Sequence, residues 1–342
     1  MSDQTPGRTG PQDGEEREIV ATPTVTGIDP VPQTVLEDPV DEVADRSYSQ
    51  GQLVMRRFVR HKGAMVALAV LVAVVLLAFT SIGFGPFPGW WSKSFVVGGP
   101  VIDGGRPTLG FLRLGEHPFG QDNIGKDYFA LVMRGTQRSL IIAFVIGLVS
   151  TFIGTLVGSL AGYYRGWVEA FLMRITDLFI VVPLLVIAAV VGQMVSGGGI
   201  MALALFLGVL TWTGLARLVR GEVLSLRERE FVVAARASGA SAPRIIVKHI
   251  LPNTVGVVIV SATLMISSAI LLETSLSYLG FGVKAPDTSL GSLISLYEQS
   301  FQTRPWLFWW PGIFILVIAL CINFIGDGLR DAFDPRQTRE KK

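Results

Sequence analysis

Few side chains in this 342-residue sequence could carry out covalent or acid–base chemistry. Its three histidines, His61, His117 and His249, are far apart, and no His-Glu-x-x-His pair is present to bind catalytic zinc. The single cysteine, Cys321, lies in an apolar run and can form neither an intrachain disulfide nor a cysteine metal cluster. We therefore expect no catalytic residue, no metal site and no cofactor bound by this chain.

One glycine-rich segment imitates a nucleotide-binding loop. Residues 120–126, GQDNIGK, match the spacing of a P-loop up to its last position, where Asp127 stands in place of Ser or Thr. A carboxylate there would repel phosphate, and no strand precedes the segment. We interpret it as a turn-rich loop at the outer mouth of a membrane span, so we expect no ATPase in this chain.

Charge inside an apolar run is costly, and three of the ionisable side chains found there call for an interpretation. Arg174 and Asp177 are three residues apart, so on a helix they share a face and are expected to pair. For Glu273 two interpretations stay open. It could line a translocation cavity and meet a substrate amine, or it could be a buried carboxylate bonded to backbone or to Ser and Thr neighbours.

A polar, basic segment interrupts the apolar part of the sequence. It covers residues 230–253, EFVVAARASGASAPRIIVKHILPN, between apolar runs at 200–219 and 255–277. One interpretation is a segment that a cytosolic partner grips. The other is a juxtamembrane helix that rests on anionic lipid, favoured by its basic residues Arg236, Arg244, Lys248 and His249. Local physics does not choose between them.

Turn chemistry predicts two short helices within residues 230–253. Gly239 can adopt the positive φ that ends a helix, Ser241 can cap the next one, and Pro243 fits its first turn. We expect Pro252 to break the second helix before the next span. The residues expected on one face of the first helix are Phe231, Val232, Ala235 and Ser238.

The elements that must position these residues are membrane spans. Half of the residues are hydrophobic and only 16% are charged, which is typical of a polytopic membrane protein rather than a soluble domain. Six apolar runs are long enough to cross a bilayer: 64–83, 138–162, 169–193, 200–219, 255–277 and 307–326. Each run must be helical, because lipid offers no hydrogen-bond partner for backbone groups.

Charge asymmetry predicts the orientation of the spans. Residues 1–50 carry eleven acids and three bases and lack an apolar face, so we interpret them as a disordered acidic tail. Bases before the first run place the N-terminus in the cytosol, and six crossings return the C-terminus to the same side. On this topology the cytosolic side has seventeen bases and the outer loops seven. Two tryptophan clusters, Trp90–Trp91 and Trp306–Trp310, then fall at the outer interface.

Small residues at four-residue spacing mark the second run. Gly154, Gly158 and Gly162 would let another helix approach closely. We favour packing within the chain over a contact with a second protein chain. Pro183 is expected to kink the third run.

Residues 230–253 resemble the cytoplasmic "EAA" loop of ABC-importer permeases. The matching residues are Ala234, Ala235, Gly239, Ile250, Leu251 and Pro252. Val233 stands where the family pattern has glutamate. The resemblance implies that a coupling helix, about residues 234–242, docks on an ATPase. The implied ATPase-coupling residues are Ala234, Ala235, Arg236, Ser238, Gly239, Ala240, Ser241, Ile250, Leu251 and Pro252.

Three further segments are similar to the second, "C-type" permease of dipeptide, oligopeptide and nickel importers. They are residues 117–140, 271–282 and 323–336. The resemblance implies a type I ABC-importer permease fold, all-α with six transmembrane helices and both termini cytosolic. It also implies a sibling permease, two cytosolic ABC ATPases that bind ATP and Mg²⁺, an extracytoplasmic substrate-binding protein and membrane lipid as partners, with no nucleic acid.

The expected organisation has four parts. An acidic tail (1–50) precedes a segment with the first span and an outer loop (51–137), a five-helix core with a coupling loop at 225–253 (138–328), and a cytosolic tail (329–342). We expect a peptide importer subunit in the bacterial cytoplasmic membrane. The alternatives are a nickel-chelate importer permease, an ion-coupled secondary transporter, or a membrane scaffold that moves nothing.

Overall fold

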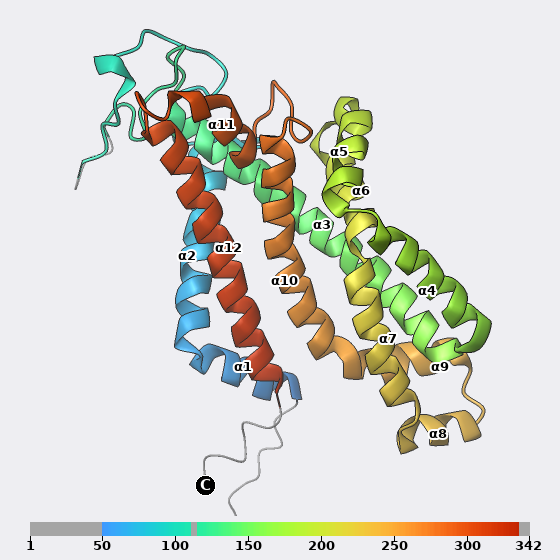
Figure 1. Cartoon of the computed structure of the whole chain (residues 1–342). Coiled ribbons are helices and arrows are strands. Elements are labelled where there is room, and N and C mark those ends of the chain that lie inside the picture. The colour runs from blue at the N-terminus through green and yellow to red at the C-terminus, as the bar shows by residue number, and fades with distance from the viewer. Residues whose placement is uncertain (1–49, 111–114, 335–342) are drawn as a thin grey trace, which may run out of the picture. The chain divides into compact units, whose positions relative to one another are not determined.

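The computed structural model describes residues 50–110 and 115–334, and these are mainly helical (Figure 1). The predicted acidic tail lies outside the described residues except for Gln50. Strands among the described residues are limited to one hairpin of β1 (Gly83–Phe84) and β2 (Phe87–Pro88). The fold is all-α, as predicted.

Four continuous helices are long and apolar enough to cross a bilayer. They are α2 (Lys62–Ser81), α3 (Tyr128–Tyr164), the helix Ala242–Tyr278, and α12 (Trp306–Phe333). Ala242–Tyr278 comprises α9 (Ala242–Ile245), a π-helical segment (Ile246–Ile250) and α10 (Leu251–Tyr278). Their length matches the roughly 30 Å of hydrocarbon that a span must cross. They are helical because a span in lipid must satisfy its backbone groups internally.

Two further spans are bent pairs. α4 (Gly166–Val181) meets α5 (Leu184–Val195) at 85°, and α6 (Gly199–Thr211) meets α7 (Thr213–Arg227) at 44°. The first break is at Pro183, as predicted, because Val182 before it is extended (φ −85°, ψ 130°) and proline disfavours a helical residue at that position. Counting each pair as one span gives the six predicted spans.

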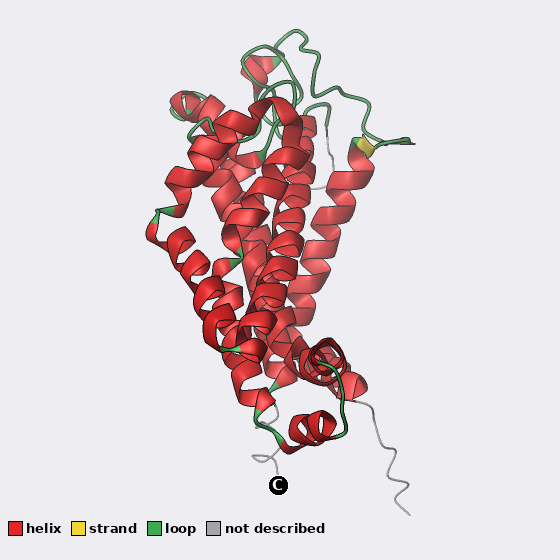
Figure 2. Cartoon of the chain, turned by 90° about the vertical axis from the view of Figure 1, so that its right-hand side faces the viewer, coloured by secondary structure: helices red, strands yellow, loops and turns green. Residues whose placement is uncertain are grey.

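The remaining short elements gather at the two ends of the spans. α1 (Gln50–Arg60) and α8 (Glu230–Ala237) lie at one end, and α11 (Leu290–Tyr297) lies at the other (Figure 1). Most of the irregular backbone lies at the α11 end (Figure 2). Short 3₁₀ turns interrupt the connections: η1 (Asp103–Gly105), η2 (Ser196–Gly198) and η4 (Glu298–Ser300). α1, which begins the described chain, and the last turn of α12 both lie at the α8 end (Figure 1), as an even number of crossings requires.

Two predicted boundaries were wrong. α3 begins at Tyr128 rather than near 138, because the Asp127 carboxylate caps the helix by accepting a hydrogen bond from the Ala130 N–H at 2.8 Å. α12 continues to Phe333, into the segment expected to be a tail. It does so because Ala332 is buried with Phe58 and Ala64, which gives the last turn an apolar contact.

The glycines of α3 are used for packing within the chain, as favoured from the sequence. A Cβ on Gly154 would lie 2.9 Å from the carbonyl oxygen of Trp212, the N-cap of α7, and a Cβ on Gly158 or Gly162 would lie 2.5 or 2.9 Å from carbonyl oxygens within α7. The backbones of α3 and α7 can approach this closely only without side chains. α3 and α7 are therefore held together as one unit.

Residues 120–126, which have the spacing of a P-loop, form a turn, as predicted. The Asp122 carboxylate accepts hydrogen bonds from the N–H groups of Ile124 (2.9 Å) and Lys126 (2.7 Å). Its other oxygen accepts from the Tyr297 hydroxyl at 2.9 Å. Burial, then the adjacent Asp122 charge, raises the pKa of Tyr297, so the phenol stays a donor. The loop is thereby attached to α11.

Candidate functional site

The segment predicted to couple to a partner folds as two helices joined at Gly239. Gly239 has φ +80°, and its N–H donates to the Arg236 carbonyl at 3.0 Å. The Ala240 N–H donates to the Ala235 carbonyl at 3.1 Å. These two bonds close α8 with a Schellman motif, which requires a left-handed residue where glycine costs little. The predicted hinge is confirmed.

The inner side of this segment is anchored to α3 and α7. Val232, Ile245 and Ile250 are fully buried, and they form one cluster with Val219 and Val223 of α7. Each such aliphatic side chain contributes about 1.5–3 kcal/mol when buried. A displacement of α8 or α9 must therefore move α7 or expose this cluster to water.

The Tyr163 ring at the end of α3 also belongs to this cluster. The Arg227 and Arg236 guanidinium groups each lie 5.8 Å from the centre of the ring. Arg227 also donates to the Tyr163 carbonyl at 2.8 Å, which ties the end of α7 to the end of α3. Arg236 reaches from α8 to the same ring, so cation–π contact adds to the apolar anchor.

The outer side of α8 is exposed and partly apolar. Phe231 and Val233 are 42% and 50% exposed, and Ala234 and Arg236 are exposed with them. The four residues predicted to share one face are on or next to this helix, but they are unevenly buried: Val232 is buried, Ala235 is half-buried, and Phe231 and Ser238 are exposed. The reason is that an eight-residue helix lying across the ends of longer helices buries only a narrow stripe.

Two local predictions near α9 need correction. Ser241 occupies the N-cap position of α9, but its side chain accepts no capping bond there. Pro252 does not break the helix, because a π-helical turn comes just before it and the Leu251 N–H donates to the Ile246 carbonyl, five residues back. The shifted register accommodates a residue that has no N–H of its own.

Glu273 does not line a cavity, so that interpretation is wrong. Its carboxylate is fully buried and accepts hydrogen bonds from the hydroxyls of Ser139 (2.8 Å) and Ser277 (2.6 Å). Ser139 in turn accepts from the Leu290 N–H at 3.3 Å. The second interpretation is confirmed: a buried carboxylate bonded to serine joins α10 to α3 and α11.

Arg174 and Asp177 do not form the expected pair. The Asp177 carboxylate accepts instead from Arg217 of α7, and Arg220 of α7 donates from Nε to Glu169 at 2.7 Å. Both acids are on α4, so the two ion pairs join α4 to α7. Packing of α7 beside α4 places these partners in reach, which sequence spacing within α4 does not show.

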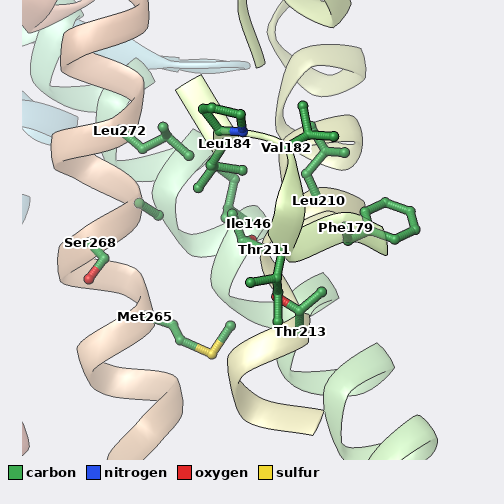
Figure 3. Close-up of a pocket in the computed structure, with 13 residues that line it drawn as sticks. Ile146, Phe179, Val182, Leu184, Leu210, Thr211, Thr213, Met265, Ser268 and Leu272 are labelled. Atoms are coloured by element: carbon green, nitrogen blue, oxygen red, sulfur yellow. The ribbon is translucent and has the colours of Figure 1, made fainter. Parts of the chain in front are cut away.

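A cavity of about 380 Å³ lies between the two helix breaks and α10 (Figure 3). Met265 and Ser268 of α10 are across from Thr211 and Thr213 at the α6–α7 break. Its lining contains hydroxyls and apolar groups but no ionisable side chain. None of these residues was predicted from the sequence to line a cavity, although the helix break predicted at Pro183 forms part of its wall.

A second missed group lies at the α11 end. Asp287 accepts a hydrogen bond from Arg134 Nε at 2.8 Å and forms an ion pair with Arg138 at 2.9 Å. These pairs fasten the connection after α10 to the first turns of α3. No group of three or more His, Cys, Asp and Glu side chains is placed to hold a metal ion within residues 50–110 and 115–334.

Comparison with known proteins decides the family. Residues 154–339 match the sequence profile of the binding-protein-dependent transport system inner membrane component, and residues 49–89 match that of the N-terminal transmembrane domain of oligopeptide transport permease C. The chain belongs to this family of transport permeases. The predicted resemblance and the predicted all-α, multi-span membrane fold of an importer permease are confirmed.

Curated relatives of this permease cover most of the chain. The chain is 40% identical to the oligopeptide transport system permease protein OppC of Mycobacterium tuberculosis, over 84% of the chain and 95% of that protein. It is 38% identical to OppC of Escherichia coli K12 over 86% of the chain and 93% of that protein. A chain of the inward-facing MetNI methionine ABC transporter matches with a TM-score of 0.49 and 22% identity, over 60% of this chain and 97% of that one.

Proposed function

We propose that this permease is a pathway-forming subunit of an ATP-driven peptide importer in a bacterial cytoplasmic membrane. A sibling permease, two cytosolic ATPases that carry ATP and Mg²⁺, and an external binding protein complete it. The observation that carries the proposal is the two-sided coupling segment: Val232 and Ile245 are buried against α7, while Phe231 and Val233 stay exposed for a partner.

α7 gives a mechanical route from this segment to the cavity. Its Val219 and Val223 pack in the cluster with Val232, and its first residue, Thr213, lines the cavity. The fifteen residues of α7 span about 22 Å at 1.5 Å per residue. A partner that pushes α8 when it binds ATP would tilt α7 about the 44° break and reshape the cavity.

Two features support a peptide as cargo. The relatives that cover most of the chain are oligopeptide permeases. The cavity combines apolar walls with the hydroxyls of Thr211, Thr213 and Ser268, which can hydrogen-bond to a peptide backbone without selecting its side chains. An ion-coupled transporter would place ionisable groups there, and this lining has none.

The test uses the exposed side of α8. Ala234→Arg puts a long charged side chain on that side, while Ala234→Ser keeps it small. With the complete transporter expressed in cells, we expect Ala234→Arg to lower ATPase co-purification and labelled-oligopeptide uptake at least tenfold. Ala234→Ser should stay within twofold of the unmodified chain. Membrane content of the chain, measured by immunoblot, should be equal in both variants.

The alternatives predict other results. Equal ATPase recovery with both variants would reject docking on α8. Uptake of a nickel chelate that peptides do not compete with would favour the nickel-chelate importer. Uptake by proteoliposomes of this chain alone, driven by an ion gradient, would favour a secondary transporter.

A further inference from the structure

A groove separate from the cavity and from the exposed side of α8 lies between α1, the start of α10 and the end of α12. Its volume is about 850 Å³. The walls are mainly apolar and are formed by Leu53, Phe58, Val255, Ile259, Leu329 and Phe333. Leu53, Val255 and Ile259 are 38–42% exposed, so the groove is open to a long apolar ligand.

Positive charge surrounds the α1 side of this groove. Arg57 lines it and donates to the Asp334 carbonyl at 3.3 Å. Arg56, Arg60 and Lys62 accompany it, and no acid occurs between residues 47 and 102. The end of α12 carries Arg330 and the acids Asp327, Asp331 and Asp334, so the bases at this end still exceed the acids. The local charge therefore favours an anionic ligand.

The groove also lies where spans meet the membrane surface. The start of α10 and the end of α12 both line it, and α1 lies beside the ends of α2 and α12 (Figure 1). α1 exposes Leu53, Met55 and Val59 together with its arginines, which is the composition of a helix in the interface. Apolar walls with a basic edge at this depth match a lipid, whose chain is apolar and whose headgroup is charged.

We propose that this groove binds an anionic phospholipid, with an acyl chain along the α10 and α12 walls and the phosphate beside Arg57. The guanidinium can donate two hydrogen bonds to phosphate oxygens. Pro252 and Asn253 also line the groove. The lipid would thus touch the point where the π-helical segment joins α10, and any effect on transport rests on the proposed function.

The test measures lipid retention by the full-length chain, so it is independent of ATPase coupling. The chain is reconstituted with phosphatidylglycerol and phosphatidylcholine in equal amounts, extracted in mild detergent, and weighed by native mass spectrometry. We expect retention of phosphatidylglycerol in preference to phosphatidylcholine. Arg57→Gln should lower that preference about fivefold, the effect of one base near a membrane surface. Arg244→Gln, at the same end but outside the groove, should change it less than twofold.

A substitution that fills the groove tests whether its apolar walls hold the acyl chain. Gly51 lines the groove, and a Cβ there meets no atom within 4 Å, so Gly51→Trp can enter without a clash. We expect it to lower retention of both lipids. Photoactivatable phosphatidylglycerol should label residues 51–58, 252–259 or 329–333 in the unmodified chain. Equal loss in Arg57→Gln and Arg244→Gln, or no preference for phosphatidylglycerol, would overturn the proposal. So would a Met55→Cys crosslink to another protein subunit in membranes, which would make the groove a protein interface.

Discussion

Gly239 and Glu273 show what a single residue determines in this permease. Glycine is favoured at position 239 by the backbone conformation, whose φ is +80°. Space is not the reason, because a Cβ there would meet no neighbour within 4 Å. Glu273 is defined by its neighbours, because the hydroxyls of Ser139 and Ser277 both donate to it in a fully buried site. The first role can be predicted from turn chemistry, and the second needs the positions of two other elements.

Substitution of Gly239 should act through backbone strain alone. Gly239→Ala must hold a left-handed conformation that costs an L-residue about 1–2 kcal/mol. We expect amide hydrogen exchange in α8 to become about tenfold faster, with normal membrane insertion. Gly239→Asn, which tolerates this conformation better, should exchange more slowly than Gly239→Ala. Identical exchange in the two variants would show that φ is not the constraint.

Substitution of Glu273 should affect stability and not cargo. Glu273→Ala leaves two buried serine hydroxyls without their acceptor, at about 1–3 kcal/mol each. We expect a clearly lower melting temperature in detergent for this variant. Glu273→Gln keeps the shape and one acceptor oxygen, so its melting temperature and peptide uptake should stay close to those of the unmodified chain. A stable Glu273→Gln protein with abolished uptake would restore a direct role in transport.

At the scale of elements, helix contacts explain how a short surface segment is connected to the spans. α3 and α7 approach closely along Gly154, Gly158 and Gly162, and α4 is joined to α7 by the Asp177–Arg217 and Glu169–Arg220 pairs. The end of α7 carries Val223, which packs against α8 and α9. The unit that a partner would move is therefore this group of helices rather than α8 alone.

The α3–α7 contact can be tested with a matched pair of glycines. A Cβ at Gly158 would lie 2.5 Å from the Ala216 carbonyl oxygen, whereas a Cβ at Gly221 of α7 meets no atom within 4 Å. Gly158→Ala should destabilise the protein by about 1–3 kcal/mol through overpacking. Gly221→Ala should be neutral or stabilising by about 1 kcal/mol, because alanine favours the helix. Thermal unfolding in detergent compares them, and equal melting temperatures would contradict the close approach.

At the scale of the whole described molecule, the two bent spans form the cavity. The breaks at Pro183 and Trp212 turn α5 and α6 away from α4 and α7, and α10 closes the other side. Neither break creates a cavity alone. The space exists because α10 passes both breaks at the level of Met265 and Ser268 (Figure 3).

Accessibility of adjacent serines checks this arrangement. Ser268 lines the cavity and is exposed, while Ser267 is 2% exposed and donates to the Ala319 carbonyl at 3.2 Å. In a background with Cys321→Ala, we expect Ser268→Cys to react with a charged, membrane-impermeant thiol reagent at least tenfold faster than Ser267→Cys. The reverse order, or equal rates, would place the aqueous pathway elsewhere.

The sequence by itself determined the membrane class, the six spans, the break at Pro183 and the glycine-closed helix at Gly239. Hydropathy and turn chemistry act over short windows of chain, so they can be interpreted without a partner segment. Only the tertiary structure decided that Asp177 pairs with Arg217 rather than Arg174, that Glu273 is enclosed by serines, and that Pro252 continues a helix. Those outcomes depend on which distant segments approach each other, and in a membrane protein almost every helix face is apolar enough to permit several approaches.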